Sequence, residues 1–261
     1  MINILSLGAG VQSSTVLLMS CRGVLPKLDA AIFADTQWEP KAVYEWLKDV
    51  LEPEAKRASI PLYTVTAGNI RKDWRERIVA GSRAASIPFY TEPKPQAEHE
   101  GRLGRQCTKE YKIEPIQNKM RELAGEEKVT LWYGISGDEM RRMRMSQVRW
   151  LENYYPLIFG LERPYHRHDC QRWLSANGFT PAPRSACIGC PNHGNEEWRA
   201  LQDTSNEWEQ AVEFDRLIRH SVDQPAYLHR SCKPLPMIDF STPEERGQQN
   251  WLNECEGMCG V

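Results

Sequence analysis

The chain has 261 residues, of which 41% are hydrophobic, and its 33 basic residues nearly balance its 35 acidic residues. This balance gives no signal of a global polyanion-binding surface and leaves a local basic patch open. No apolar stretch approaches the roughly 18 residues that a membrane span requires. The length suits one α/β domain with appended segments. Because the N-terminus has neither the charged n-region nor the cleavage site of a signal peptide, we expect a cytoplasmic protein without membrane contacts.

The start of the chain predicts a strand, a tight polar loop and a helix. Residues 2–7 form an apolar run short enough for a buried strand, and helix-forming apolar residues resume at 15–19. The turn between them places glycines, free backbone N–H groups and hydroxyls at a helix N-terminus, where anions bind. The spacing of this turn is neither that of a Rossmann fingerprint nor that of a Walker loop. We expect Ser13 or Ser14 to cap the helix. The predicted phosphate-binding loop comprises Ser6, Gly8, Ala9, Gly10, Gln12, Ser13 and Ser14.

Hydrophobic periodicity predicts the remaining elements in chain order. Further strands are expected at residues 29–34, 61–66, 128–135 and 155–158, and helices at 41–51, 69–80, 107–124, 168–176 and, as a pair, within 195–220. Residues 81–106 have no clear period, which is typical of a lid, a binding loop or disorder.

Polar side chains follow two of the predicted strands. Asp35 and Thr36 come after the second strand, and Ser136 to Glu139 come after the fourth. Ligands of doubly wound sheets sit at the carboxyl ends of strands, so Asp35 either reaches a ribose or base or caps the next helix. The arginines that follow the fourth strand either bind an anion or form a solvated helical face; they are Arg141, Arg142, Arg144 and Arg149.

Eight cysteines in a cytosolic chain indicate metal ligands, nucleophiles or buried thiols rather than a disulfide framework. Cys21 and Cys170 lie in helix-like apolar stretches and are expected to be packing residues. Cys187 and Cys190 form a CxxC closed by proline, which suits zinc, an iron–sulfur cluster or a redox dithiol. The role of Cys232 stays open.

The motifs resemble one protein superfamily when they are taken in order. Residues 9–14 resemble the PP-loop, written SGGxDS, of ATP pyrophosphatases and phosphoadenosine-phosphosulfate (PAPS) reductases, with Ser13 where the ATP-cleaving branch has aspartate. Residues 35–40 resemble the DTGxxFPET block of PAPS reductases. Residues 134–139 are similar to their GIRxxES stretch, with Ser136 in place of the arginine. The resemblance implies that Gly134 contributes to the nucleotide site, and Arg141, Arg142 or Arg144 would have to supply the charge of the missing arginine.

The resemblance extends to the iron–sulfur adenylyl-sulfate (APS) reductases. Residues 106–116 resemble their Cys-Cys-x-x-x-Lys-x-x-Pro-Leu block, and a CxxC follows in both. This implies a 4Fe–4S cluster on Cys107, Cys187 and Cys190, whose fourth position is filled by a tail cysteine, substrate, water or sulfide. Zinc, completed by Cys107 and His193, or no metal, are the alternatives.

The implied fold is a twisted, mainly parallel α/β sheet of about five strands with an adenine nucleotide at its carboxyl edge. Residues 1–180 would form this PP-loop domain, with 81–106 as a loop or lid. Residues 181–261 would form a CxxC-containing helical segment with a cysteine tail packed on it. The tail holds Cys255 and Cys259 and resembles the ECGLH tail that carries the nucleophile of these reductases.

Three hypotheses follow. In the first, the chain reduces PAPS or APS: the loop holds the phosphosulfate, Asp35 and Thr36 face the nucleoside, and Cys255 or Cys259 attacks the sulfur before thioredoxin or another thiol donor releases sulfite. In the second, an iron–sulfur enzyme uses ATP to transfer sulfur to a nucleic-acid base or another acceptor. In the third, the chain is a non-catalytic, zinc-stabilised nucleotide-binding module.

Overall fold

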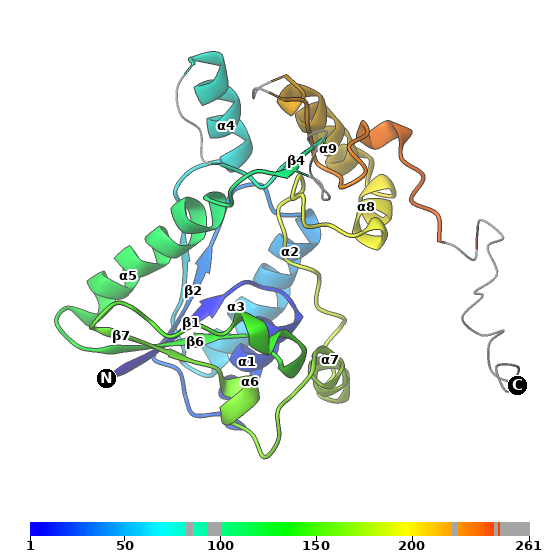
Figure 1. Cartoon of the computed structure of the whole chain (residues 1–261). Helices are drawn as coiled ribbons and strands as arrows, with labels where there is room; N and C mark the ends of the chain where they lie inside the picture. Colours follow the sequence, from blue (N-terminus) through cyan, green and yellow to red (C-terminus); the bar gives the residue numbers. More distant parts are fainter. Residues whose placement is uncertain (82–85, 93–100, 221–223, 243–244, 246–261) are drawn as a thin grey trace, which may run out of the picture. The chain divides into compact units, whose positions relative to one another are not determined.

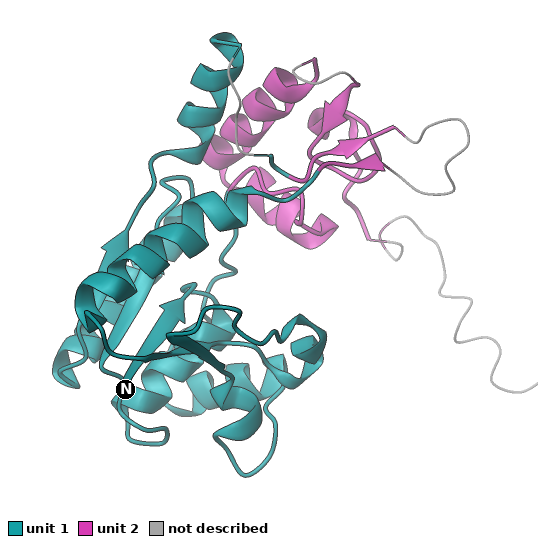
Figure 2. Cartoon of the chain, turned by 60° about the vertical axis from the view of Figure 1, so that its left-hand side comes forward, with its two compact units in different colours: residues 1–87, 104–187 teal, residues 88–103, 188–261 magenta. Residues whose placement is uncertain are grey.

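The computed structural model describes residues 1–81, 86–92, 101–220, 224–242 and 245 (Figure 1). The chain divides into two compact units, coloured separately in Figure 2. Unit 1 comprises residues 1–87 and 104–187, and unit 2 comprises residues 88–103 and 188–261. The sequence-based division lay between residues 180 and 181, whereas the chain leaves unit 1 after Cys187. Part of the predicted loop, residues 88–103, belongs to unit 2.

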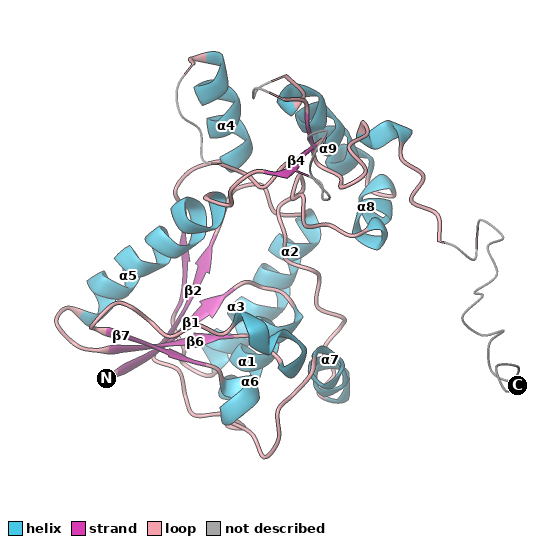
Figure 3. Cartoon of the chain, viewed as in Figure 1, coloured by secondary structure: helices cyan, strands magenta, loops and turns pink. Residues whose placement is uncertain are grey.

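Unit 1 is built on a sheet of five parallel strands (Figure 3). The strand order is β3-β2-β1-β6-β7, and the strands are β1 (Ile2–Leu7), β2 (Ala30–Ala34), β3 (Leu62–Val65), β6 (Val129–Tyr133) and β7 (Leu151–Tyr154). The predicted α/β class and parallel sheet are confirmed. The prediction of a strand at residues 155–158 is wrong, because β7 ends at Tyr154 and Pro156 opens a short helix, α6 (Pro156–Phe159). Proline has no N–H for a strand ladder, but it suits the first turn of a helix.

Helices cover both faces of this sheet because successive residues of each strand point to opposite sides. In β1, Leu5 packs with one core cluster and Ile4 with the other; in β2, Phe33 and Ile32 divide in the same way. The helices on the Leu5 side include α1 (Val11–Cys21), α2 (Lys41–Trp46), η1 (Leu47–Leu51), α3 (Glu52–Arg57) and α7 (Arg167–Ala176), and Leu157 of α6 packs in the same cluster. The helix on the Ile4 side is α5 (Glu114–Ala124), preceded by η2 (Lys109–Ile113).

The helix predicted at 41–51 continues to Arg57, and Pro53 lies near the start of its last section, α3. Pro115 has the same place in α5. A π-helical turn, η1 or η2, precedes each proline. Since proline lacks an N–H and its ring collides with the carbonyl one turn earlier, a locally widened helix lets the chain continue through it. The remaining helix of this region, α4 (Ile70–Val79), starts at the predicted Asn69, whose side chain accepts the N–H of Lys72 at 2.9 Å.

Unit 2 pairs short antiparallel strands with two helices, α8 (Asn195–Gln202) and α9 (Ser205–Ile218), which confirms the helix pair predicted within 195–220. Its strands are β4 (Tyr90–Thr91), β5 (Gly101–Arg102) and β8 (Ala226–Tyr227), and a 3-10 turn, η4, spans Leu235–Met237. The loop predicted at 81–106 therefore contains two short strands. Asp215 of α9 is buried and accepts the N–H groups of Leu228 and Leu235 at 3.1 and 3.2 Å, which ties the C-terminal segment to the helix.

Among the described residues, no helix combines the length and the apolar character that crossing a bilayer requires.

Candidate functional site

The strand order of the sheet reverses between β1 and β6, because the chain adds strands first on one side of β1 and then on the other. Strands β2 and β3 extend the sheet on one side of β1, and β6 and β7 extend it on the other (Figure 1). The loop after β1 and the segment after β6 therefore meet at the carboxyl edge of the sheet. In open α/β sheets this topological switch point is where ligands bind.

The loop after β1 turns directly into helix α1. Gly10 is the N-cap residue, and Ala9 is buried with a left-handed φ of 55°. The Ser13 hydroxyl accepts the N–H of Gly8 at 3.1 Å and donates to the Gly10 carbonyl oxygen at 3.4 Å. The prediction that Ser13 or Ser14 caps the helix is wrong, because the helix begins at Val11 and both serines lie in its first turn. The first-turn N–H groups of α1 still point out of its N-terminus, as in every α-helix.

Two of the predicted hydroxyls lie elsewhere. Ser14 is fully buried, and its Oγ accepts the indole N–H of Trp46 at 2.9 Å. Ser6 lies half-buried within β1, in register with Ile32 and Tyr133 on the two neighbouring strands. The structure therefore gives Ser14 a packing role and leaves Ser13 as the serine bonded within the loop.

Gly134, at the end of β6, lets the two sides of the switch point touch. A Cβ atom at this position would lie 2.5 Å from the Ser13 nitrogen, 2.6 Å from its Cα and 2.9 Å from the carbonyl carbon of Gln12. Carbon atoms normally approach one another to about 3.5–4.0 Å, so no larger residue fits without a backbone shift. Gly134 thus sets the position of the loop relative to β6.

Gln12 connects the loop to two distant parts of the chain. Its amide nitrogen donates to Glu139 Oε2 at 3.2 Å and lies 3.4 Å from Ser136 Oγ, both from the segment after β6. Its amide oxygen accepts the guanidinium of Arg167, the first residue of α7, at 3.0 Å. Sequence reasoning did not find Arg167, because nothing near it in the sequence marks a residue 155 positions from its partner.

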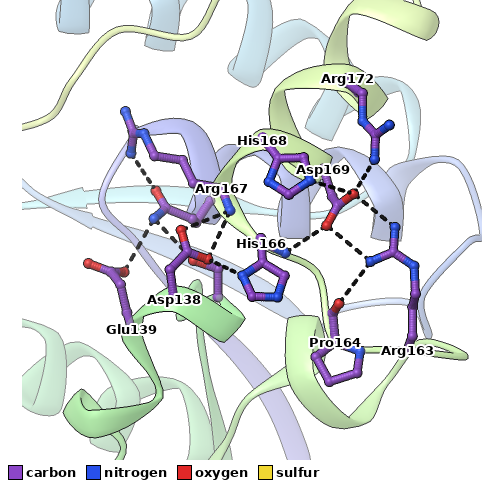
Figure 4. Close-up of polar contacts among 11 residues, drawn as sticks. Asp138, Glu139, Arg163, Pro164, His166, Arg167, His168, Asp169 and Arg172 are labelled. Carbon is purple, nitrogen blue, oxygen red and sulfur yellow. Dashed lines mark hydrogen bonds and ion pairs between the residues drawn. The ribbon is translucent and has the colours of Figure 1, made fainter. Parts of the chain in front are cut away.

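Charged contacts hold the N-terminus of α7 in place (Figure 4). Asp169 is buried; it accepts both guanidinium nitrogens of Arg163 at 2.8 and 3.1 Å, one of Arg172 at 2.5 Å and the backbone N–H of His166 at 2.9 Å. The hydrogen bonds from Arg163, then that from the His166 backbone, hold the pKa of Asp169 well below its usual range. This carboxylate therefore fixes the first turn of α7.

A second carboxylate, Asp138, links α7 to the segment after β6, where η3 spans Gly137–Arg142. Its two oxygens each lie 3.1 Å from the backbone nitrogen of Arg167, and Oδ1 lies 3.1 Å from His166 Nδ1. Burial acts to raise the pKa of Asp138, but the hydrogen bonds from the Arg167 backbone and the Ser136 hydroxyl lower it overall. Asp138 and Asp169 together keep Arg167 beside Gln12. Arg141, also predicted for the site, is exposed on η3.

The end of β2 carries a second polar group. Asp35 Oδ1 accepts the N–H of Gln37 at 2.7 Å and the hydroxyl of Tyr44 at 2.8 Å, so it stabilises its own turn and does not cap α2, whose N-cap residue is Pro40. The next residue, Thr36, is buried and donates to Glu39 Oε1 at 3.2 Å. Burial, followed by the bond to Asp35, raises the pKa of Tyr44 above its usual range, so this phenol stays a hydrogen-bond donor.

Glu39 is buried and was not predicted as a site residue. The ammonium group of Lys112 reaches its Oε1 at 3.0 Å. Cys187 joins the same group: its Sγ lies 3.2 Å from the hydroxyl of Thr36 and 3.6 Å from Glu39 Oε1. The CxxC thus begins at the end of β2.

The segment that leads to Cys187 also passes the phosphate loop. A Cβ atom at Gly10 would lie 3.4 Å from Ser185 Cβ and 3.8 Å from the carbonyl oxygen of Pro183. Residues 183–187 therefore run from the start of α1 to the end of β2, along the carboxyl edge of unit 1. The structure brings one predicted metal ligand to the edge that carries the predicted phosphate loop.

The other predicted sulfur ligands have separate places. Cys107 is half-buried at the start of the helical segment that leads to η2, and its N–H lies 3.2 Å from the Ser86 carbonyl oxygen. Cys190 belongs to unit 2, where its carbonyl accepts the N–H of His193 at 3.1 Å. Cys255 and Cys259 lie outside the described residues. In the part of the chain that the structure describes, no three or more His, Cys, Asp or Glu side chains are grouped so as to hold a metal ion.

Two further thiols have the packing role predicted for them. Cys170 is fully buried in the core on the Leu5 side of the sheet, and Cys21 packs against that core. Burial raises the pKa of Cys170 to about 12 and that of Cys21 to about 11, so both stay protonated and unreactive near neutral pH.

Comparison with known proteins adds no relative: no protein-family model matches the sequence, and no curated protein matches it significantly. The function is therefore argued from the residues and their geometry.

Proposed function

We propose that this chain is an enzyme that binds an adenine nucleotide at the Gly8–Ser14 loop and reduces PAPS or APS to sulfite. The observation that carries the proposal is the arrangement around Gln12. The N-terminus of α1 opens at the switch point of the sheet, and the guanidinium of Arg167 lies 3.0 Å from the Gln12 amide oxygen. Helix N–H groups and a fixed guanidinium together suit a phosphate or sulfate group.

The absence of an acidic side chain from the loop itself supports a substrate that arrives already activated. Ser13 stands where the ATP-cleaving proteins of the superfamily have aspartate. A phosphosulfate carries its own leaving group, the nucleoside phosphate. Its binding site therefore needs hydrogen-bond donors to the anion rather than a carboxylate that would organise ATP cleavage.

The proposed chemistry uses the tail thiols. The thiolate of Cys255 or Cys259 attacks the sulfur of the sulfate group, the bond from sulfur to the bridging phosphate oxygen breaks, and the nucleotide leaves with that electron pair. The product is a cysteine S-sulfonate. A second thiol, from thioredoxin or another thiol donor, then attacks the cysteine sulfur; a disulfide forms and sulfite leaves with the electron pair. The two thiols thereby supply the two electrons of the reduction.

A metal centre belongs to the proposal. The resemblance suggests Cys107, Cys187 and Cys190 as its ligands, and three thiolates would be soft donors of the kind that bind a 4Fe–4S cluster or zinc. In support, Cys187 lies beside Thr36 at the end of β2, close to the ammonium group that Lys112 directs at Glu39. When bound, the centre would supply an electrostatic field that orients the substrate.

Turnover and binding assays test the proposal. We expect the anaerobically purified chain to release sulfite from PAPS or APS in the presence of a reduced dithiol protein. Gln12→Ala removes the contact with Arg167 and should weaken nucleotide binding about tenfold or more. Gln171→Ala, on the exposed face of α7, is the matched control and should bind as the wild type does. A chain that binds neither nucleotide and releases no sulfite contradicts the proposal.

A second function is ATP-dependent transfer of sulfur to a nucleic-acid base. The observation that favours it is a run of exposed arginines beside the site, on and after η3: Arg141, Arg142 and Arg144. These side chains suit a phosphate backbone. Release of pyrophosphate from ATP that depends on added tRNA or DNA, without sulfite release from PAPS, would replace the first proposal by this one.

A further inference from the structure

A run of arginines and methionines spans the end of η3 and the residues after it, within unit 1. Residues 140–145 read Met-Arg-Arg-Met-Arg-Met, and all three arginines are exposed. None of the chain's 35 acidic residues lies between positions 140 and 151. Because the chain as a whole has a formal net charge of -2, this 140–145 segment is a local concentration of positive charge.

Hydrogen bonds hold the segment at the carboxyl edge of the sheet. The Tyr155 hydroxyl accepts the N–H of Arg144 and donates to its carbonyl oxygen, both at 2.7 Å, and Tyr155 directly follows β7. The Asn153 amide donates to the same carbonyl at 2.9 Å. The Arg144 guanidinium donates to the carbonyl oxygens of Arg141 and Met143 at 2.7 Å. A surface that is already ordered loses less conformational entropy when a partner binds.

Two apolar side chains of the segment are exposed to solvent. Met145 has 93% of its surface exposed and Met140 has 48%. Met and Arg are both enriched in protein–protein interfaces, where the flexible thioether adapts to the surface of the partner. A nucleic acid would offer phosphates to the arginines but little apolar surface to the methionines. The composition of the segment therefore favours a protein partner that carries acidic side chains.

Arg142 connects the segment to the phosphate loop. Its guanidinium pairs with Glu139 Oε1 at 2.5 Å, and Glu139 Oε2 accepts the amide N–H of Gln12 at 3.2 Å. One carboxylate thus separates the segment from the loop proposed to hold the phosphosulfate. In the proposed reaction a thiol donor attacks the cysteine S-sulfonate that forms at this loop, so the donor has to bind within reach of this edge of the sheet.

We propose that the 140–145 segment docks the thiol donor of the proposed reaction, and that this donor is a protein with acidic side chains around its dithiol. The inference rests on the proposed function and adds to it the docking surface and the charge of the partner. Arg144 keeps its positive charge, because it donates to neutral carbonyl groups. Opposite charges steer the two proteins together and fix their relative orientation, while the methionines contact apolar surface beside the dithiol.

Sulfite release by the full chain tests the inference through the KM of the donor protein. The probe is a reduced thioredoxin of net negative charge, varied at a saturating concentration of PAPS or APS, and dithiothreitol replaces it in a parallel assay. Met145→Glu places a carboxylate in the segment, so the KM for thioredoxin should rise about tenfold or more. The KM for the nucleotide and the rate with dithiothreitol should keep their wild-type values, because a small dithiol needs no docking surface. Met145→Lys also removes the methionine but should raise the KM for thioredoxin less, and added salt should reduce the difference between the two variants.

The matched control is Arg149→Glu. Arg149 is exposed and lies on the same connection between β6 and β7, but it precedes Leu151, which pairs with Val129 at the opposite, amino edge of the sheet. Arg149→Glu changes the net charge of the chain more than Met145→Glu does, yet it should leave the KM for thioredoxin at the wild-type value. Calorimetric titration of thioredoxin into each chain gives dissociation constants that do not depend on turnover.

Three results would overturn the inference: a wild-type KM and dissociation constant for thioredoxin in Met145→Glu, an equal rise of both in Arg149→Glu, or binding of tRNA or DNA that Met145→Glu weakens while thioredoxin binding stays unchanged. The last result would assign the segment to a nucleic acid. The dithiothreitol assay separates this inference from the proposed function. A chain that releases sulfite with dithiothreitol and shows one of these results loses only the docking surface. A chain that releases no sulfite with either dithiol contradicts the proposed function and this inference with it.

Discussion

Replacing Gly134 by alanine tests the reasoning about how the phosphate loop is positioned. The added methyl would lie 2.5–2.9 Å from three backbone atoms in the first turn of α1. Normal contacts need about 3.5 Å or more, so β6 and α1 must separate by roughly 1 Å. Backbone atoms cannot rotate away as a side chain can. We therefore expect a cost near the upper end for overpacking, about 3 kcal/mol, which lowers the melting temperature by roughly 6–12 °C.

The assay is thermal unfolding followed by circular dichroism, together with nucleotide binding. Gly104→Ala is the control, since among the described residues its methyl would meet only Ser86 Oγ, at 3.9 Å, and it should melt as the wild type does. In Gly134→Ala, the nucleotide affinity should fall together with the melting temperature, because the same shift moves Ser13 and Gln12. A variant that melts within about 2 °C of the wild type would refute the close approach of β6 and α1.

Three other predictions each concern one side chain. Arg167→Met should weaken nucleotide binding about tenfold or more while the fold persists, and an unchanged affinity in a calorimetric titration would remove Arg167 from the site. Burial lowers the pKa of His229, so on acidification the unfolded chain takes up a proton that the folded chain does not. The free energy of unfolding should therefore keep its full value above about pH 6.5 and fall below that pH by up to about 1.4 kcal/mol per pH unit. Urea unfolding at several pH values should show a smaller decline for His229→Gln. Trp46→Phe removes the indole N–H that donates to Ser14 Oγ at 2.9 Å inside the core. It should lower the free energy of unfolding by about 2 kcal/mol in the same assay, and a loss below about 0.5 kcal/mol would contradict that hydrogen bond.

Much of the fold followed from local patterns. The apolar runs at residues 2–7, 29–34, 61–66 and 128–135 became strands of one parallel sheet, and the helix pair within 195–220 became α8 and α9. Local patterns gave wrong predictions where the same kind of sequence suits two different structures. The apolar run at 155–158 suited a strand, but Pro156 started a helix. The serines after Gly10 looked like caps, but the helix had already begun at Val11.

The sequence by itself determined which residue types were available: a glycine-rich turn before a helix, a polar tip after β2 and a CxxC. Only the tertiary structure decided which of them meet. Gln12 bonds Arg167, Gly134 touches Ser13, and Cys187 lies beside Thr36 and Glu39, across separations of up to 155 residues. The physical reason is that periodicity, caps and turns act over a few residues. Partners at a sheet edge are instead selected by strand order, and strand order is set by how the whole chain buries its apolar faces.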